Sequence, residues 1–157
     1  MKGTVNTVNR IAPFAVEASW ATGRWQTLDK YLRLYDGNVS EVFNLGVGQA
    51  LLCLKDGDVA RFKEHIQMLR DKVAGSMTYS TTSSLRASHD AMLRCHVLSD
   101  LEMIANERLK GDGDQQPILT ALDRRLEVLG AYVSDKQHLL GIRRAAMELM
   151  RYVTLRL

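Results

Sequence analysis

The chain has 157 residues, of which 46% are hydrophobic and 6% aromatic, and it holds 21 basic against 18 acidic side chains. This length suits one domain with a sizeable core, and the interspersed charges give weak electrostatic steering at most, which disfavours a strongly basic nucleic-acid-binding protein. The sequence has no run of about 18 uncharged apolar residues and no apolar run near its start, which argues against membrane insertion and secretion.

The first two helices are predicted to form a hairpin. The first covers residues 13–22, because Pro13 suits a first helical turn and Gly23 suits a helix end. The second covers residues 25–35. The residues of the first helix expected to face inward are Phe14, Ala18, Trp20 and Ala21.

A second hairpin is predicted from residue 38 onward. Asn38 followed three residues later by Glu41 resembles a capping box that begins the third helix, and Gly57 ends it. Asp58 is expected to cap a fourth helix that ends at Gly75. The apolar faces of these two helices are expected to contain Phe43, Val47, Ala50, Leu51, Leu54, Phe62, Ile66, Leu69 and Val73.

The C-terminal half is predicted to contain longer helices. Residues 76–84 indicate a loop, residues 84–109 one long helix and residues 110–116 another loop. A sixth helix follows Pro117, and Ser134 begins the last one, giving seven helices and no strand. The expected apolar positions are Leu85, Met92, Leu93, His96, Val97, Leu101, Ile104, Ile118, Leu119, Leu122, Leu126, Leu129, Leu139, Ile142, Ala146, Met150, Val153 and Leu157.

Two ten-residue segments repeat the same pattern. GRWQTLDKYL begins at Gly23 and GDVARFKEHI at Gly57, an offset of 34 residues, which is the tetratricopeptide period. A glycine turn followed by one apolar helix face predicts helix pairs that must stack on neighbours to bury that face. We predict an all-α, tetratricopeptide-like α-solenoid of antiparallel hairpins. Its repeat anchors are Gly23, Trp25, Leu28, Leu32, Gly57, Val59, Phe62 and Ile66.

The repeat does not continue regularly. At the next 34-residue step Ala91 lies inside the predicted long helix, so we expect two hairpins over residues 10–75 and irregular helices over 84–157 within a single helical segment, 1–157. Because the last apolar stripe has no stop signal, the chain is expected to be a fragment of a longer protein. If the ring of Trp25 is buried, Trp25→Ala should destabilise the fold by about 3 to 5 kcal/mol.

Several stretches resemble the FAT region of the phosphatidylinositol-3-kinase-related kinases, above all the ATR-type checkpoint kinases. These stretches are EASWATGRWQTLDKYL and FNLGVGQALLCLKDGDVARFKEHIQML, then LRCHVLSDLEMIA from Leu93, and DKQHLLGIRRAAMELM from Asp135. The last is similar to the PILALRR helix of that family, which follows a short RL-containing segment, here Arg125-Leu126. The similarity covers roughly residues 10 to 152.

The resemblance implies a non-catalytic helical scaffold in a nuclear Ser/Thr protein kinase of the DNA-damage checkpoint. It implies protein partners, namely the kinase domain, neighbouring solenoid helices, and a dimer partner or checkpoint regulator. It implies no cofactor in this segment, whereas the kinase domain would use ATP and Mg. The alternative is a stand-alone tetratricopeptide-like adaptor that binds a peptide in a concave groove.

Other patterns have simpler explanations than a ligand site. Gly46 and Gly48 lack the strand and third small residue of a dinucleotide loop, so close helix packing is favoured. His89, Cys95 and His96 lack further zinc ligands, and Asp112 and Asp114 lack the later ligands of a calcium loop. Cys53 and Cys95 form no disulfide framework, which favours a reducing compartment.

The remaining polar features leave two explanations each. The hydroxyl-rich residues 76–84 are either a loop that ends in a helix cap or a phosphorylation site. The C-terminal arginines, interleaved with acidic residues, favour salt-bridged helix packing over nucleic-acid contact. Trp20 and Trp25 are expected to be core residues rather than base-stacking platforms. No nucleophile-elbow, phosphate-loop or kinase motif occurs, so this chain is not expected to be an enzyme. The C-terminal arginines expected to form salt-bridged packing are Arg124, Arg125, Arg143, Arg144, Arg151 and Arg156.

Overall fold

The protein is an all-α molecule in the computed structural model, which describes residues 2–78, 85–109, 114, 116–130 and 132–154. These residues form seven α-helices, one short 3-10 helix and no strand, which confirms the predicted fold class. The helices are α1 (Lys2–Ala21), α2 (Trp25–Leu34), η1 (Val39–Glu41), α3 (Phe43–Asp56), α4 (Val59–Thr78), α5 (Leu85–Leu109), α6 (Gln116–Glu127) and α7 (Val133–Thr154).

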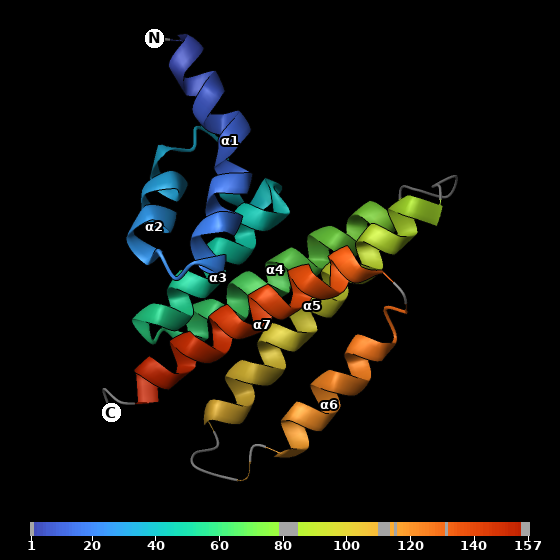
Figure 1. Ribbon diagram of the computed structural model, residues 1–157. Helices are drawn as coiled ribbons and strands as arrows, with labels where there is room; N and C mark the ends of the chain where they lie inside the picture. Colours follow the sequence, from blue (N-terminus) through green and yellow to red (C-terminus); the bar gives the residue numbers. More distant parts are fainter. Residues whose placement is uncertain (1, 79–84, 110–113, 115, 131, 155–157) are drawn as a thin grey trace.

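The helices stack in chain order, except for the last one (Figure 1). The helix pairs α1–α2 and α3–α4 are hairpins, α5 packs on α4, and α6 packs mainly on α5. The last helix, α7, turns back and packs against α5, α3 and α1. A single apolar core runs through all seven helices, so α7 closes the array rather than extending it.

The 34-residue repeat appears in the backbone of the two hairpin turns. Gly23 and Gly57 both have a left-handed conformation, with φ of 70° and 78°. The next residue in each turn donates its N–H to a carbonyl five residues back, Arg24 to Ser19 at 2.8 Å and Asp58 to Cys53 at 2.9 Å. This is the Schellman closure of a helix end, which a residue with a Cβ adopts at a cost.

The other repeat anchors lie at equivalent depths in the two hairpins. Leu28 and Phe62 are fully buried, and Leu32 and Ile66 lie beside them in the core. Trp25 and Val59 are only partly buried at the start of their helices. Because the Trp25 ring is only partly buried, Trp25→Ala should lower the free energy of unfolding by less than the roughly 3 to 5 kcal/mol expected for a buried ring. The tryptophan that is buried is Trp20, which is 3% exposed.

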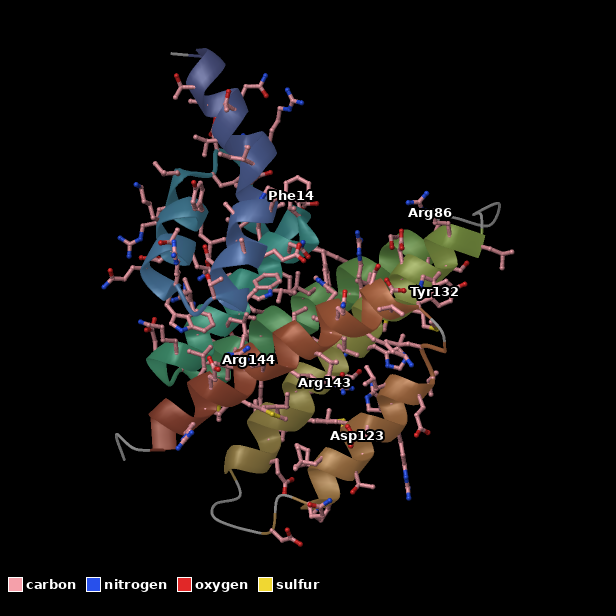
Figure 2. All side chains as sticks on the ribbon, in the orientation of Figure 1. Phe14, Arg86, Asp123, Tyr132, Arg143 and Arg144 are labelled. Carbon is pink, nitrogen blue, oxygen red and sulfur yellow. The ribbon has the colours of Figure 1, made fainter. Side chains whose placement is uncertain are left out.

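The predicted start of the first helix is wrong, and its predicted buried face is right only at Trp20. The helix begins at Lys2, and Pro13 lies inside it rather than at its first turn. Proline has no N–H to donate to the carbonyl of Asn9. The side chain of Asn9 forms two hydrogen bonds with the backbone of Asp36, which link this turn of α1 to the end of α2. Phe14 is 73% exposed (Figure 2), and Ala18 and Ala21 are also exposed, because the buried stripe is Ala12, Val16, Ser19 and Trp20.

Two further helix limits differ from those predicted. Asn38 caps η1, accepting from the Ser40 N–H at 3.0 Å, and α3 begins only at Phe43. Asp58 does cap α4, accepting from the Arg61 N–H at 3.0 Å, but α4 runs through Gly75 to Thr78. Part of each predicted loop, at 79–84 and at 110–113 and 115, lies outside the described residues, as do the expected side-chain positions of Val153 and Leu157.

Most expected core positions of the later helices are buried, with clear exceptions. Leu85, Met92 and Leu119 are exposed, at the solvent edge of α5 and α6. His96, Leu93, Ile118 and Leu126 are intermediate. The residues that the pattern missed are Ala91, Leu98, Ala105, Ala145 and Leu149, all buried.

The Leu-Gly-Val-Gly segment of α3 is a packing site, as predicted. A Cβ at Gly48 would lie 2.6 Å from Cγ1 of Val16 on α1, and a Cβ at Gly46 would overlap the side chain of Leu69 on α4. Leu69 can move its branched end, whereas Val16 is stiff at χ1. Gly48 therefore sets how closely α1 approaches α3.

Gly48→Ala should destabilise the fold by about 1 to 3 kcal/mol, because the new methyl group forces α1 away from α3. The matched control is Gly141→Ala in α7, where a Cβ meets no described atom within 4 Å. That substitution should stabilise the fold by about 0.5 to 1 kcal/mol, since alanine is the better helix former. Urea denaturation midpoints measure both. A midpoint that falls equally for the two variants would contradict the packing role of Gly48.

Candidate functional site

A buried charge cluster joins the last three helices. Asp100 on α5 is fully buried, and its two carboxylate oxygens bind two arginines from different helices. Nε of Arg125 on α6 lies 2.6 Å from one oxygen, and Nε of Arg143 on α7 lies 2.8 Å from the other. Arg143 is itself buried and also donates to the Leu122 carbonyl of α6 at 2.8 Å.

This cluster fixes how α6 and α7 sit on α5. An arginine that loses its carboxylate inside a core retains a desolvated charge, so each of the three side chains depends on the others. In the described part of the chain α6 packs mainly on α5, with few fully buried apolar residues of its own. The Arg125–Asp100 pair is therefore a large share of its attachment. The expected salt-bridged packing is found here for two of the six C-terminal arginines, Arg125 and Arg143; Arg143 is labelled in Figure 2.

Two of the four stretches that carry the family resemblance, together with the short RL segment, meet at this cluster. Asp100 lies in LRCHVLSDLEMIA, Arg125 is the arginine of the RL pair, and Arg143 lies in the arginine-containing last helix. Sequence reasoning singled out both arginines but not Asp100. A signal was present, because Asp100 lies three residues after Val97 and four before Ile104, on the apolar face of a helix.

His96 adds a titratable group to the edge of the cluster. Its Nδ1 lies 3.2 Å from Nη2 of Arg125. Since a guanidinium only donates, Nδ1 accepts and the neutral ring holds its proton on Nε2. Burial of the ring, followed by the charge of Arg125, lowers the pKa of His96 below its ordinary value of 6.5, and the charge of Arg143 acts in the same direction against Asp100.

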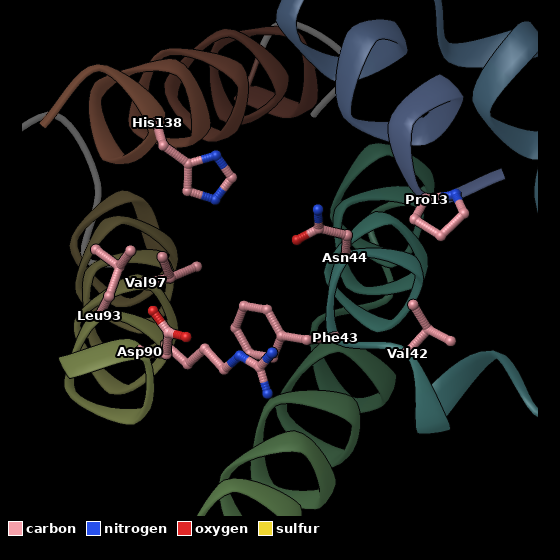
Figure 3. Close-up of a pocket in the computed structure, with 9 residues that line it drawn as sticks. Pro13, Val42, Phe43, Asn44, Asp90, Leu93, Val97 and His138 are labelled. Atoms are coloured by element: carbon pink, nitrogen blue, oxygen red, sulfur yellow. The ribbon is translucent and has the colours of Figure 1, made fainter. Parts of the chain in front are cut away.

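A second polar centre joins α7 to the first half of the chain. Glu17 on α1 accepts from Nδ1 of His138 on α7 at 3.0 Å and from Nδ2 of Asn44 on α3 at 3.2 Å. His138 and Asn44 both line a cavity of about 350 Å³ between these helices and α5 (Figure 3). Arg94 of α5 stacks over the Phe43 ring at the cavity wall, 5.2 Å from its centroid.

The other residues singled out in the sequence lie apart from these two centres. His89 pairs with Asp135 of α7 at 2.5 Å and stacks on Tyr132, so it does not share a site with His96, which contacts Arg125 at the edge of the Asp100 cluster. Across the described ranges, no three His, Cys, Asp or Glu side chains converge on a metal position.

The remaining candidates are structural or surface groups. Cys53 is buried, burial raises the pKa of its thiol, and it forms no disulfide with Cys95. Arg144 pairs with Glu148 on the same exposed helix face. Asp114 accepts from the Gln116 N–H in a helix-start turn, and Asp112 lies outside the described residues.

A family model of the FAT domain matches residues 12–155, most of the chain. The chain belongs to the FAT-domain family. FAT domains are helical, non-catalytic regions of the phosphatidylinositol-3-kinase-related kinases, in which they act through protein–protein contacts. The resemblance to a FAT region is confirmed at that level. None of the helices in the described part of this FAT domain is long and apolar enough to cross a bilayer.

Asp100→Asn should destabilise the FAT domain by about 3 to 5 kcal/mol, because it leaves two arginines without their carboxylate. The matched control is Glu148→Gln, which removes the exposed pair with Arg144 and should cost about 0 to 1 kcal/mol. Guanidinium-chloride unfolding followed by circular dichroism measures both. Equal midpoints for the two variants would show that the buried cluster contributes no more than a surface pair.

His96→Gln should make the FAT domain less sensitive to acid. The folded-state pKa of His96 is lowered, so below about pH 6.5 the unfolded chain binds the proton more readily and stability falls. Above that pH both states hold the ring neutral and the contribution is constant. Glutamine can still accept from Arg125 but does not titrate. Unfolding free energies at about pH 7 and about pH 5 should therefore differ less for the variant than for the original chain; an identical pH slope would contradict this role.

Proposed function

We propose that this FAT domain is the scaffold segment of an ATR-like Ser/Thr protein kinase in DNA-damage checkpoint signalling. In this role it supports and regulates the kinase domain through protein contacts and works in the nucleus, while ATP and Mg bind the kinase domain only. The observation that supports the proposal most is the convergence on Asp100 of two of the stretches that resemble the ATR-type kinases and of the short RL segment.

The proposed mechanism is mechanical. Packed helices with buried polar contacts tend to adopt discrete arrangements rather than deform continuously. Here α7 is bonded to α5 through Asp100 and Arg143 and to α1 through Glu17 and His138. A partner that shifts α7 therefore acts on both halves of the scaffold together, which is a route by which contacts at one end could reach a kinase domain at the other.

The alternative of a stand-alone peptide adaptor receives less support. An adaptor built from helical hairpins uses a concave surface formed by successive repeats. In this FAT domain α7 packs across α1, α3 and α5, the first helices of the successive units. The surface that those helices share is occupied by the chain itself.

The proposal predicts that the gene product containing this FAT domain carries a lipid-kinase-like catalytic domain on the same polypeptide. Affinity tagging at the gene, followed by mass spectrometry of the purified product, checks this, and fluorescence of the tagged protein checks its nuclear location. A product without that domain would contradict the scaffold role.

The checkpoint assignment is tested in cells. With Asp100→Asn in the gene, phosphorylation of checkpoint substrates after ultraviolet irradiation should be strongly reduced, since the scaffold is destabilised. Glu148→Gln should leave it unchanged, because it alters only a surface pair. A normal checkpoint response in the Asp100→Asn cells, at normal protein abundance, would count against a checkpoint kinase.

A further inference from the structure

The cavity between α1, α3, α5 and α7 has apolar walls and a carboxylate, Asp90, that takes part in none of the contacts described above. Its volume is about 350 Å³, near the lower end of the range for small-molecule sites, roughly 300 to 1,000 Å³. That size suits one long side chain. The residues lining it are Pro13, Val42, Phe43, Asn44, Asp90, Leu93, Arg94, Val97 and His138.

Glu17 determines which atoms of His138 and Asn44 remain for a ligand. A carboxylate accepts only, so His138 must donate from Nδ1 and Asn44 from its amide nitrogen. In the neutral imidazole Nε2 is then an acceptor, and the free atom of the Asn44 amide is its carbonyl oxygen. The ring of Trp20, with its centroid 6.4 Å from that of His138, helps to hold the imidazole in place.

A third acceptor comes from α5. Asp90 lines the cavity, and no described residue forms a hydrogen bond or ion pair with it. Figure 3 shows His138, Asn44 and Asp90 around the same space, from three different helices. Three acceptors favour a ligand rich in N–H donors. The lining also contains one cation, Arg94, but its guanidinium lies over the Phe43 ring, so the charge of Asp90 favours a positive ligand on the acceptor side of the cavity.

One cation of the chain itself, the guanidinium of Arg94, already lies against the aromatic wall of the cavity. Arg94 stacks its guanidinium over the Phe43 ring at 5.2 Å, and no described residue pairs with its charge. Stacking on an aromatic face is typical of arginine, whose planar group also donates to several acceptors at once. Arg94 therefore occupies the aromatic wall from inside the chain, and a second guanidinium would compete with it there.

From this arrangement we propose that the cavity is a docking site for the guanidinium of an arginine side chain on a partner protein. The guanidinium donates to Asn44 Oδ1, His138 Nε2 and the Asp90 carboxylate. Its aliphatic stem lies against Leu93 and Val97. The inference deepens the partner-binding part of the proposed scaffold role, but it does not depend on which kinase contains this FAT domain.

The probe is the tripeptide acetyl-Gly-Arg-Gly-amide, titrated into the ¹⁵N-labelled 157-residue chain and followed by NMR. We expect saturable binding with a dissociation constant of about 1 mM, and shifts of the Asn44 side-chain amide and of His138. The matched probe with citrulline in place of arginine has the same shape without the charge and should bind at least tenfold more weakly. Equal binding of the two peptides would overturn the proposal.

Two substitutions should change the affinity in opposite directions. Asp90→Asn removes the charged acceptor and should weaken binding about fivefold or more, while Arg94→Ala removes the competing cation and should tighten it. Asp90 and Arg94 are exposed, so neither is a core residue, although Arg94→Ala also removes the contact with the Phe43 ring. The control is Asp123→Asn, an exposed carboxylate on α6, which should leave the affinity unchanged. If Asp90→Asn and Asp123→Asn behave alike, the cavity is not the site.

A last comparison separates a protein partner from a free metabolite. Free arginine and guanidinium chloride offer the same group without a peptide backbone. If either binds more tightly than the tripeptide, the site is one for a small molecule, and the partner assignment is wrong. Failure of all arginine probes would overturn this inference and leave the scaffold role to be judged by the catalytic domain and checkpoint experiments alone.

Discussion

The structure depends on one constraint: an α-hairpin cannot bury its own apolar face. The hairpins α1–α2 and α3–α4 bury theirs by stacking, and α5 adds a further layer. The layer shared by α1, α3 and α5 would still be open without α7, whose apolar stripe covers it with Leu139, Ile142, Ala145, Ala146, Leu149 and Met150, each at most 3% exposed. Because α7 closes this face, the contacts between the two ends of the chain belong to the core itself.

Closure by apolar contact alone would leave the position of α7 poorly defined, because aliphatic side chains pack acceptably in several registers. Asp100 removes that freedom. Its two oxygens each take one guanidinium, from Arg125 and Arg143, and a shift of one helical turn would leave charges buried without partners. The cluster is costly to desolvate, so its physical effect is on specificity of arrangement more than on net stability. That is the property that a scaffold transmitting discrete shifts requires.

The sequence predicted what depends on neighbours along the chain and missed what depends on distant partners. The glycine turns and the buried pair Leu28 and Phe62 follow from a local 3.6-residue pattern, and the structure has them in matching positions. The direction faced by α1 was predicted correctly only at Trp20, since its buried stripe is selected by packing on α2, α3 and α7. Arg143 binds Asp100 across 43 residues, and His138 binds Glu17 across 121, separations at which no local pattern indicates pairing.

The cavity is part of the same closure. Its acceptors come from α3, α5 and α7, and Glu17 of α1 orients two of them, so its shape is defined only when α7 is in place. Moving α7 along its axis would separate His138 from Glu17 and Arg143 from Asp100 together, because both pairs involve the same helix. A ligand that binds only the intact acceptor set must therefore stabilise the closed array by its own binding free energy. Recognition at this surface and rigidity of the scaffold are consequently coupled through a single helix.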